Sequence, residues 1–190
     1  YIIAAGLIVP NSNIVLKNVG LNPTRTGILD VVTMMGGDIE VLNEQTVSGE
    51  PVGDLRIKTS DLKGCNISGE IIPRLIDELP IIAVLATQAD GETIIRDAKD
   101  LRNKESDRIA TTVKELRKLG ADIDELDDGF VINGKKELSG GVTLETYDDH
   151  RLAMSLYIAG LICKNPITIN NFEWANISFP EFEKSFTTLM

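Results

Sequence analysis

Histidine and cysteine are nearly absent from this sequence, which has one histidine and two cysteines in 190 residues. Zinc sites are built mostly from His and Cys side chains at short spacings. Cys65 and Cys163 lie far apart, with no Cys-x-x-Cys motif. We therefore expect no His/Cys metal site. The two thiols are expected to be reduced and partly buried, as in an intracellular protein.

Positive charge and long apolar runs are also scarce. The chain has 19 Lys and Arg against 29 Asp and Glu, a formal net charge of -10. No basic run supplies the positive surface that nucleic acids require. No apolar run is long enough to cross a membrane, and residues 1–9 lack the basic leader of a secretory peptide. We expect neither nucleic acid nor a membrane as a partner. Small anionic substrates need only a local cluster of cations.

The composition is that of an ordinary globular protein, with 43% hydrophobic and 25% charged residues, and one domain over residues 1–190 is expected. One pattern occurs three times: an apolar helix, a turn, a β-branched strand and a second helix. The apolar helices are predicted at residues 2–9, 80–89 and 153–163, the strands at 14–19, 93–98 and 167–172, and the second helices at 24–35, 106–119 and 180–189. Such self-similarity indicates an α/β domain built from repeated units.

The first two units also share the sequence pattern that follows their second helices. Gly36 and Gly120 are predicted to end their second helices, and alternating residues after each glycine predict a strand. Further strands are predicted near residues 55–59, 129–132 and 142–145. The third unit has no such strand after its second helix, and the sequence starts abruptly on an apolar segment without Met. We therefore expect the closing strands to come from polypeptide outside this sequence.

Charged residues stand before several of these helices. Asp77 precedes Pro80 and a nearly all-apolar helix. An acidic residue at this place complements the helix dipole, which is one interpretation. The alternative is a general base whose basicity is raised by desolvation against the apolar helix.

The densest charge lies in residues 97–108, directly before a predicted amphipathic helix. Lys104 and Arg108 are four residues apart and would share one face of a helix, with Glu105 beside them. Ser106 is the predicted N-cap. One interpretation is a set of solvated surface ion pairs. The other is an anion site in which Glu105 moves a proton.

A third cluster, residues 147–151, precedes the last apolar helix. A single histidine is more often a structural hydrogen-bonding residue than a catalyst, so His150 is expected to be structural. Arg151 is a stronger candidate for binding, because a guanidinium can grip a carboxylate in bidentate fashion.

Three motifs together resemble the 5-enolpyruvylshikimate-3-phosphate synthase family, the 3-phosphoshikimate 1-carboxyvinyltransferases. They are Asp-Glu-Leu-Pro at residues 77–80, Leu-Arg-Asn-Lys-Glu-Ser-Asp-Arg at 101–108 and Asp-His-Arg-Leu-Ala-Met-Ser at 149–155. Residues 18–27 and 178–180 extend the resemblance to the whole sequence. The resemblance implies an inside-out α/β domain of three βαβαββ-like repeats, the last incomplete here. The chain would be the C-terminal part of a two-domain cytoplasmic enolpyruvyl transferase.

The implied reaction moves the enolpyruvyl group of phosphoenolpyruvate to the 5-hydroxyl of shikimate 3-phosphate and releases phosphate, in chorismate and aromatic amino acid biosynthesis. The resemblance implies no metal or organic cofactor. It makes Asp77 the acceptor of the hydroxyl proton and Glu105 the proton donor to the methylene, alone or with Lys104. Lys104 would also bind substrate anions, and Arg108 and Arg151 would hold phosphoenolpyruvate, the ligand with which glyphosate competes.

Two departures from the family pattern matter. Residues 176–178 are Asn-Ile-Ser, where many members carry a Lys before the Phe-Pro of the last segment. The family's other half supplies further substrate contacts, so this chain alone is expected to be inactive. Two alternatives stay open: the sister transferase acting on UDP-N-acetylglucosamine, whose segments lack these motifs, and a non-catalytic α/β module whose charged residues cap helices.

Overall fold

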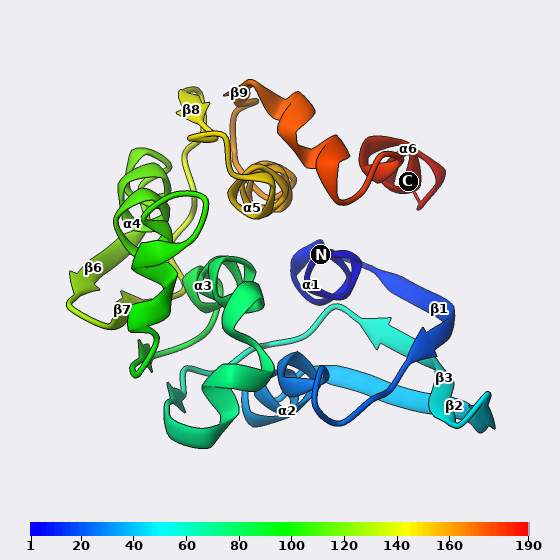
Figure 1. Ribbon diagram of the computed structural model, residues 1–190. Coiled ribbons are helices and arrows are strands. Elements are labelled where there is room, and N and C mark those ends of the chain that lie inside the picture. The colour runs from blue at the N-terminus through cyan, green and yellow to red at the C-terminus, as the bar shows by residue number, and fades with distance from the viewer. Residues whose placement is uncertain (190) are drawn as a thin grey trace.

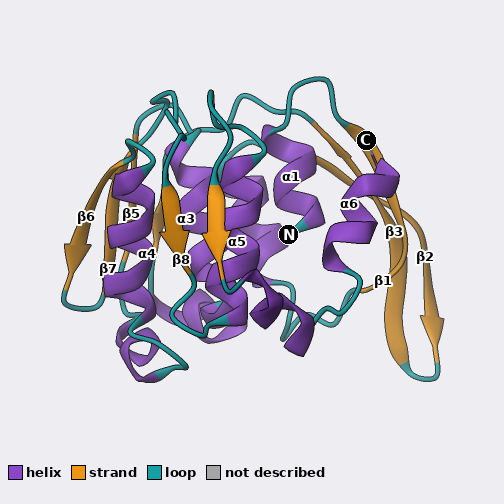
Figure 2. Cartoon of the chain, turned by 90° about the horizontal axis from the view of Figure 1, so that it is seen from above, coloured by secondary structure: helices purple, strands orange, loops and turns teal. Residues whose placement is uncertain are grey.

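The computed structural model describes residues 1–189, so Met190, the last residue of the expected domain, lies outside the described part. Three helices occupy the centre: α1 (Ile2–Ile8), α3 (Leu79–Thr87) and α5 (His150–Gly160). Figure 1 looks nearly along these helices and Figure 2 shows them from above, with strands on both sides. α3 packs against both α1 and α5. The helices therefore form the inner layer, as the expected inside-out α/β fold requires.

The sequence of α3 explains its central place. It reads Leu-Pro-Ile-Ile-Ala-Val-Leu-Ala-Thr, and every one of its residues is buried. A helix that is apolar on all sides is stable only when protein surrounds it. Pro80 stands in the first turn of α3, where its missing N–H group would have no helical partner.

The strands form three outer sheets, one for each repeat. The first sheet is antiparallel and has the order β1-β3-β2, with β1 (Asn13–Gly20), β2 (Asp38–Val47) and β3 (Glu50–Lys58). The second has the order β4-β5-β7-β6, with β4 (Asn66–Ile67), β5 (Glu92–Ile95), β6 (Asp122–Leu126) and β7 (Gly129–Asn133). The third is a parallel pair, β8 (Thr143–Glu145) and β9 (Thr168–Asn170).

Three more α-helices and four short 3-10 helices complete the chain. The α-helices are α2 (Gly27–Met34), α4 (Arg108–Lys118) and α6 (Phe182–Leu189). The 3-10 helices are η1 (Gly69–Arg74), η2 (Ile76–Glu78), η3 (Lys99–Asn103) and η4 (Phe172–Ile177). None of the described helices is long and apolar enough to cross a membrane.

The predicted repeat is confirmed, and the second unit is its full form: β4, α3, β5, α4, β6 and β7 follow one another along the chain. The third unit runs β8, α5, β9 and α6, and no strand follows α6 among residues 1–189. The first unit begins directly with α1, so within the described residues it has no counterpart of β4. The sequence did not predict this second gap.

Several predicted boundaries were wrong by a few residues. The strand expected at 93–98 ends at Ile95, because Asp97 turns the backbone into the left-handed region with φ 62°. The helix expected at 24–35 begins at Gly27, because the residues before it form a turn in which Asn22 Oδ1 accepts a hydrogen bond from Thr24 N at 3.0 Å. Gly36 and the equivalent glycine of the second unit have positive φ, as expected at helix ends.

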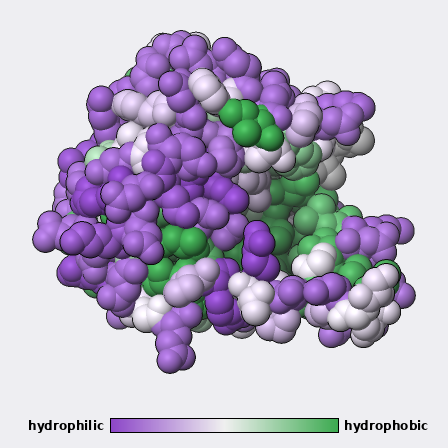
Figure 3. Space-filling view, viewed as in Figure 1, coloured by the Kyte–Doolittle hydropathy of each residue, from purple (hydrophilic) through white to green (hydrophobic). Residues whose placement is uncertain are grey.

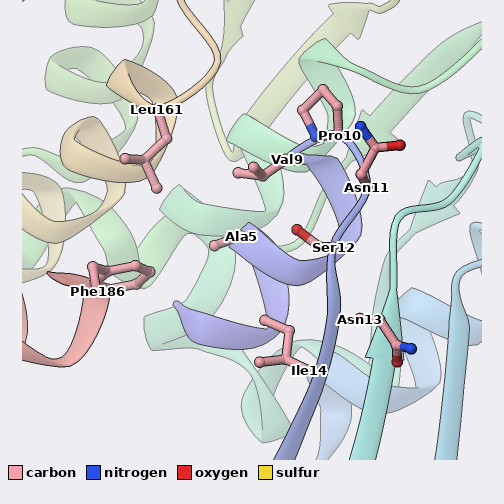
Figure 4. A pocket seen from close by; sticks show the side chains of 9 residues that line it. All are labelled: Ala5, Val9, Pro10, Asn11, Ser12, Asn13, Ile14, Leu161 and Phe186. Carbon is pink, nitrogen blue, oxygen red and sulfur yellow. The ribbon is translucent and has the colours of Figure 1, made fainter. Parts of the chain in front are cut away.

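A hollow lies between the first and third units. Its volume is about 460 Å³, and it is lined by Ala5, Val9, Pro10, Asn11, Ser12, Asn13, Ile14, Leu161 and Phe186. Figure 4 shows Val9 and Ile14 on one side of it and Leu161 and Phe186 on the other. Apolar residues also gather in the recess that Figure 3 shows between the α6 and β1 sides of the molecule. The hollow lies by the C-terminal ends of α1 and α5.

Candidate functional site

The inner helices α1, α3 and α5 all begin at the same end of the domain. The Tyr1 hydroxyl donates to the carbonyl oxygen of Arg151 at 3.4 Å, which joins the starts of α1 and α5. Arg151 Nη1 lies 3.5 Å from the carbonyl oxygen of Asp77 and 3.4 Å from Glu78 Oε1, which joins the starts of α5 and α3. The positive ends of the helix dipoles therefore face one region, and this favours a bound anion.

Asp77 lies in η2, directly before α3, and is the meeting point of the predicted site residues. Its Oδ1 accepts from Arg108 Nη1 at 3.0 Å and lies 3.2 Å from Lys104 Nζ. Its Oδ2 is 3.6 Å from Arg151 Nη2. The side chain is 33% exposed, so a small molecule could reach it. Residues from three distant segments are thus brought together around one carboxylate.

The protonation of Asp77 differs from the expectation of raised basicity. Burial alone would raise the pKa of this carboxyl, as the neighbouring apolar helix suggested, but Arg151, Lys104 and Arg108 outweigh burial and hold the pKa below its ordinary value. At neutral pH Asp77 is therefore a carboxylate and a good acceptor of hydrogen bonds.

Arg108 is buried, with 1% of its side chain exposed. Its Nη2 donates to Glu105 Oε2 at 2.5 Å, and its Nε donates to Asp149 Oδ2 at 2.7 Å. Burial alone would lower the pKa of Arg108, but the surrounding carboxylates raise it. The interpretation of Arg108 as part of a solvated surface ion pair is therefore wrong. Because the guanidinium is occupied by protein carboxylates, an anion could reach it only by replacing Asp77 or Glu105.

The local structure around Lys104 also differs from the expected helix face. Lys104 has extended backbone, with φ -88° and ψ -158°, and α4 begins only at Arg108. The N-cap is Asp107, whose Oδ1 accepts from Ala110 N at 3.0 Å, so the prediction of Ser106 as the cap was wrong. Lys104 is 30% exposed. A turn, not a shared helix face, brings it to the same carboxylate as Arg108.

Arg102 fixes the segment that carries Lys104 and Glu105. Its Nε donates to the carbonyl oxygen of Asp127, in the β6–β7 turn, at 2.8 Å, and its Nη2 to that of Leu126, the last residue of β6, at 2.7 Å. Its Nη1 donates to Asp107 Oδ2 at 2.9 Å. One guanidinium therefore ties the start of α4 to the second sheet.

Glu105 and His150 lie side by side at the rim of the site. Glu105 is 45% exposed, and its Oε1 is 3.9 Å from His150 Nδ1. His150 is the first residue of α5 and is 13% exposed. Its expected structural role stays a prediction.

Asp149 is the residue that sequence reasoning missed. It is fully buried and caps α5, because Oδ1 accepts from Arg151 N at 2.9 Å and from Leu152 N at 3.2 Å. Its Oδ2 accepts from Ser106 Oγ at 3.0 Å as well as from Arg108. An Asp directly before an apolar helix is a known N-cap signal. That signal could have located the helix start three residues earlier than predicted.

The site is therefore a cluster of carboxylates and cations. Lys104, Arg108 and Arg151 interleave with Asp77, Glu78, Glu105 and Asp149. Within residues 1–189, no group of His, Cys, Asp and Glu is arranged to hold a metal ion. What the cluster offers chemically is anion binding by the cations and proton transfer by the exposed carboxylates.

Comparison with known proteins identifies a family for the chain. The family described as EPSP synthase (3-phosphoshikimate 1-carboxyvinyltransferase) matches residues 1–186. A 3-phosphoshikimate 1-carboxyvinyltransferase of Petrotoga mobilis is 59% identical over 186 residues, which are 98% of this chain and 43% of the relative. One from a Thermoanaerobacter species is 53% identical over 189 residues, which cover 100% of this chain and 44% of the relative. The chain thus spans less than half the length of these relatives.

Solved structures give the same result. EPSP synthase from Acinetobacter baumannii superposes with a TM-score of 0.94 at 38% identity, over 98% of this chain and 44% of that one. The enolpyruvyl transferase NikO from Streptomyces tendae has a TM-score of 0.76 at 20% identity, over 98% of this chain and 41% of that one, and shares the fold. By sequence and by structure, the chain belongs to the EPSP synthase family.

Proposed function

We propose that this chain forms one wall of an active site that transfers the enolpyruvyl group of phosphoenolpyruvate to the 5-hydroxyl of shikimate 3-phosphate, with release of phosphate. The observation that carries the proposal is the convergence of Asp77, Lys104, Glu105, Arg108 and Arg151 at the end where the inner helices begin. The names of its relatives support the choice of substrates. Both reactants are anions, and the site places cations beside ionisable carboxylates.

Asp77 is the proposed base. Addition of the hydroxyl across the C=C bond of phosphoenolpyruvate, an enol phosphate, needs an acceptor for the hydroxyl proton. The pKa of Asp77 lies below its ordinary value, so at neutral pH it is ionised and can accept a hydrogen bond from a substrate hydroxyl. Lys104 and Arg151 would hold this carboxylate in place, since both already lie beside it.

Glu105 is the proposed proton donor to the methylene carbon of phosphoenolpyruvate, alone or with Lys104. It is the most exposed carboxylate of the cluster and lies on a loop rather than within a helix. Its carboxylate accepts a hydrogen bond from Arg108 Nη2. Binding of phosphoenolpyruvate would replace Glu105 at that guanidinium, and the same step would free the Glu105 carboxyl for proton transfer.

Arg108 and Arg151 are the proposed phosphoenolpyruvate ligands. A carboxylate or phosphate gains most from guanidinium groups that are already oriented and shielded from water. Arg108 is buried and Arg151 is 23% exposed, with its guanidinium beside Asp77 and Glu78. Anionic substrates would thus exchange places with protein carboxylates, with no new charge buried without a partner.

The remaining half of the polypeptide would supply the opposite wall. Relatives are more than twice as long as the match, and within residues 1–189 one edge of β1 and one edge of β9 have no strand partner. We propose that segments outside this chain pair with these edges and cover the apolar hollow beside α6. The two domains would then enclose the substrates between them.

A phosphate-release assay tests the proposal. The full-length protein containing this chain is expected to release phosphate from phosphoenolpyruvate when shikimate 3-phosphate is added. It is expected to release none when UDP-N-acetylglucosamine is added in its place. Phosphate release with the nucleotide sugar alone would overturn the assignment in favour of the sister transferase. If no phosphate is released with either acceptor, the non-catalytic module is the better description.

A further inference from the structure

We infer that Asp149 is a positioning residue for this reaction: it fixes the guanidinium of Arg108 and, through Arg108, the placement of Asp77 and Glu105. The inference rests on the proposed function. It concerns a side chain that touches neither of the two exposed carboxylates and lies too deep to meet a substrate, since its exposed fraction is 0%.

Asp149 holds one edge of the guanidinium. Its Oδ2 accepts from Arg108 Nε at 2.7 Å, and its Oδ1 lies 3.3 Å from Arg108 Nη2. Two contacts along one edge fix the plane of the group as well as its position. With that edge held, the other N–H groups point outward, Nη1 to Asp77 at 3.0 Å and Nη2 to Glu105 at 2.5 Å. Asp149 therefore determines where the guanidinium meets the two exposed carboxylates.

Helix capping does not account for the negative charge of Asp149. Asn or Ser at the N-cap would accept hydrogen bonds from the same backbone N–H groups about as well as Asp. Burying a carboxylate and a guanidinium has a large desolvation cost, so the pair needs excellent geometry to persist. The charge is explained by its partner, because Arg108 is also buried and needs a counter-charge inside the protein.

Asp149 is itself held from several directions. The two N–H groups at the start of α5 and the Ser106 hydroxyl bind its oxygens. The two residues before it, Tyr147 and Asp148, have φ of 52° and 58°, a left-handed conformation that residues with side chains adopt at a cost. The Tyr147 hydroxyl donates at 2.7 Å to Glu115, a fully buried carboxylate of α4. The turn is therefore fixed at both ends, as a positioning role requires.

The decisive variant is Asp149→Asn in the full-length protein. An Asn side chain keeps an oxygen for the backbone N–H groups of α5, so the cap survives, but its charge is lost and its amide cannot accept from both Arg108 donors. We expect kcat to fall about 100-fold, the cost of misplacing catalytic groups by about 1 Å, with the KM values changed less than about threefold. The matched control is Asp30→Asn, the same change in the first turn of α2, where the arginine partner is Arg74. Its kcat is expected to stay within about threefold of wild type, since an exposed ion pair away from the cluster contributes little.

A spectroscopic readout separates this inference from the proposed function. In the wild-type protein, the buried Nε–H of Arg108 should give a slowly exchanging resonance in a ¹⁵N-arginine spectrum, assigned by its loss in Arg108→Lys. That resonance should shift and exchange faster in Asp149→Asn but not in Asp30→Asn. If the wild-type protein releases no phosphate, the proposed function fails, whereas the resonance still shows whether Asp149 fixes Arg108. An unchanged resonance in Asp149→Asn would overturn the inference.

A double variant tests whether Asp149 acts through the carboxylates. In a Glu105→Gln background, Asp149→Asn should lower kcat much less than in wild type, because residues that act as a unit are not additive. Full additivity would overturn the inference. If Asp149→Asn does not fold, Ser106→Ala replaces it: removal of one donor to Asp149 should lower kcat about tenfold and speed exchange at the Arg108 Nε–H. Wild-type kcat and exchange in Ser106→Ala would then overturn the inference.

Discussion

Three cations surround Asp77, and they set its protonation before any substrate arrives. Lys104, Arg108 and Arg151 come from the loop before α4, from α4 and from α5. Burial against α3 favours the neutral carboxyl, but the sum of the cations is stronger and the pKa falls. A carboxylate in this state is a weak base on its own. In the proposed reaction it would become effective only when a bound hydroxyl lies against it and substrate anions neutralise the neighbouring cations.

The first prediction concerns Asp77→Asn in the full-length protein. We expect kcat to fall by about 10²- to 10⁴-fold, the usual contribution of a general base. The free energy of unfolding should change by less than about 1 kcal/mol, because the carboxylate is a third exposed and such ion pairs contribute little to stability. Asp30→Asn is the control, since Asp30 is an exposed carboxylate in the first turn of α2, 2.7 Å from Arg74 Nη1. Parallel loss of activity and thermal stability would make Asp77 a helix-start residue only.

The second prediction concerns the loss of folding stability at acid pH. Burial alone would raise the pKa of Asp149, but Arg108, with donors from Leu152 and Ser106, holds it below its ordinary value of 3.8. Because the folded-state pKa lies below the unfolded one, the unfolded state binds the proton first as the pH falls. This contribution to stability is complete above the unfolded pKa and is lost as the pH falls below about 4. In urea unfolding between pH 6 and 2.5, Asp149→Asn should therefore lose less stability than wild type. A steeper loss in the variant would contradict the assigned direction.

The sequence located the exposed residues of the site better than the buried ones. Asp77, Glu105 and Arg151 belong to recognisable motifs, and the structure places them within one cluster. Asp149 stands in one of the same motifs, but its role depends on an ion pair with Arg108, more than forty residues earlier. Local pattern predicts a helix cap at this position. The choice of partner depends on how α4 and α5 pack, which no local pattern contains.

At the scale of elements, the helix and strand order could be predicted because each unit repeats the same apolar pattern. What could not be predicted is where elements begin and end. Ser106 and Asp107 are both good N-cap residues. Tertiary contacts decide between them: Arg102 holds Asp107 at the helix start, and Asp149 takes the Ser106 hydroxyl. The short strand β4 carries too little pattern to be recognised from the sequence.

The third prediction concerns the close approach of β7 to its neighbour. A Cβ added at Gly129 would lie 1.9 Å from the carbonyl oxygen of Ile95, a backbone atom of β5. Gly129→Ala should therefore force the strands apart and lower the free energy of unfolding by about 1–3 kcal/mol, as overpacking does. Gly20→Ala is the control, because a Cβ at Gly20, the last residue of β1, meets no atom within 4 Å. Urea unfolding followed by circular dichroism measures both. Equal effects of the two variants would show that strand separation is not the cause.

At the scale of the whole molecule, the inner helices serve two purposes. Their apolar side chains form the continuous core, and their N-terminal ends gather the charged residues on one face. The other end of α1 and α5 borders the apolar hollow. The proposed site and the hollow therefore lie at opposite ends of the same helices. A substitution at a residue that lines the hollow should therefore lower the free energy of unfolding without a comparable fall in kcat.

The last prediction follows from the proposal that this chain forms only one wall of the active site. The chain alone is expected to release no phosphate from phosphoenolpyruvate and shikimate 3-phosphate, whereas the full-length protein does, because one wall of cations cannot enclose two anions away from water. Inactivity is informative only if the chain is folded, so the same sample must show cooperative urea unfolding and the slowly exchanging Nε–H of Arg108. Steady phosphate release by the folded chain would contradict the proposal that the opposite wall is needed, since all catalytic groups would then lie within these 190 residues.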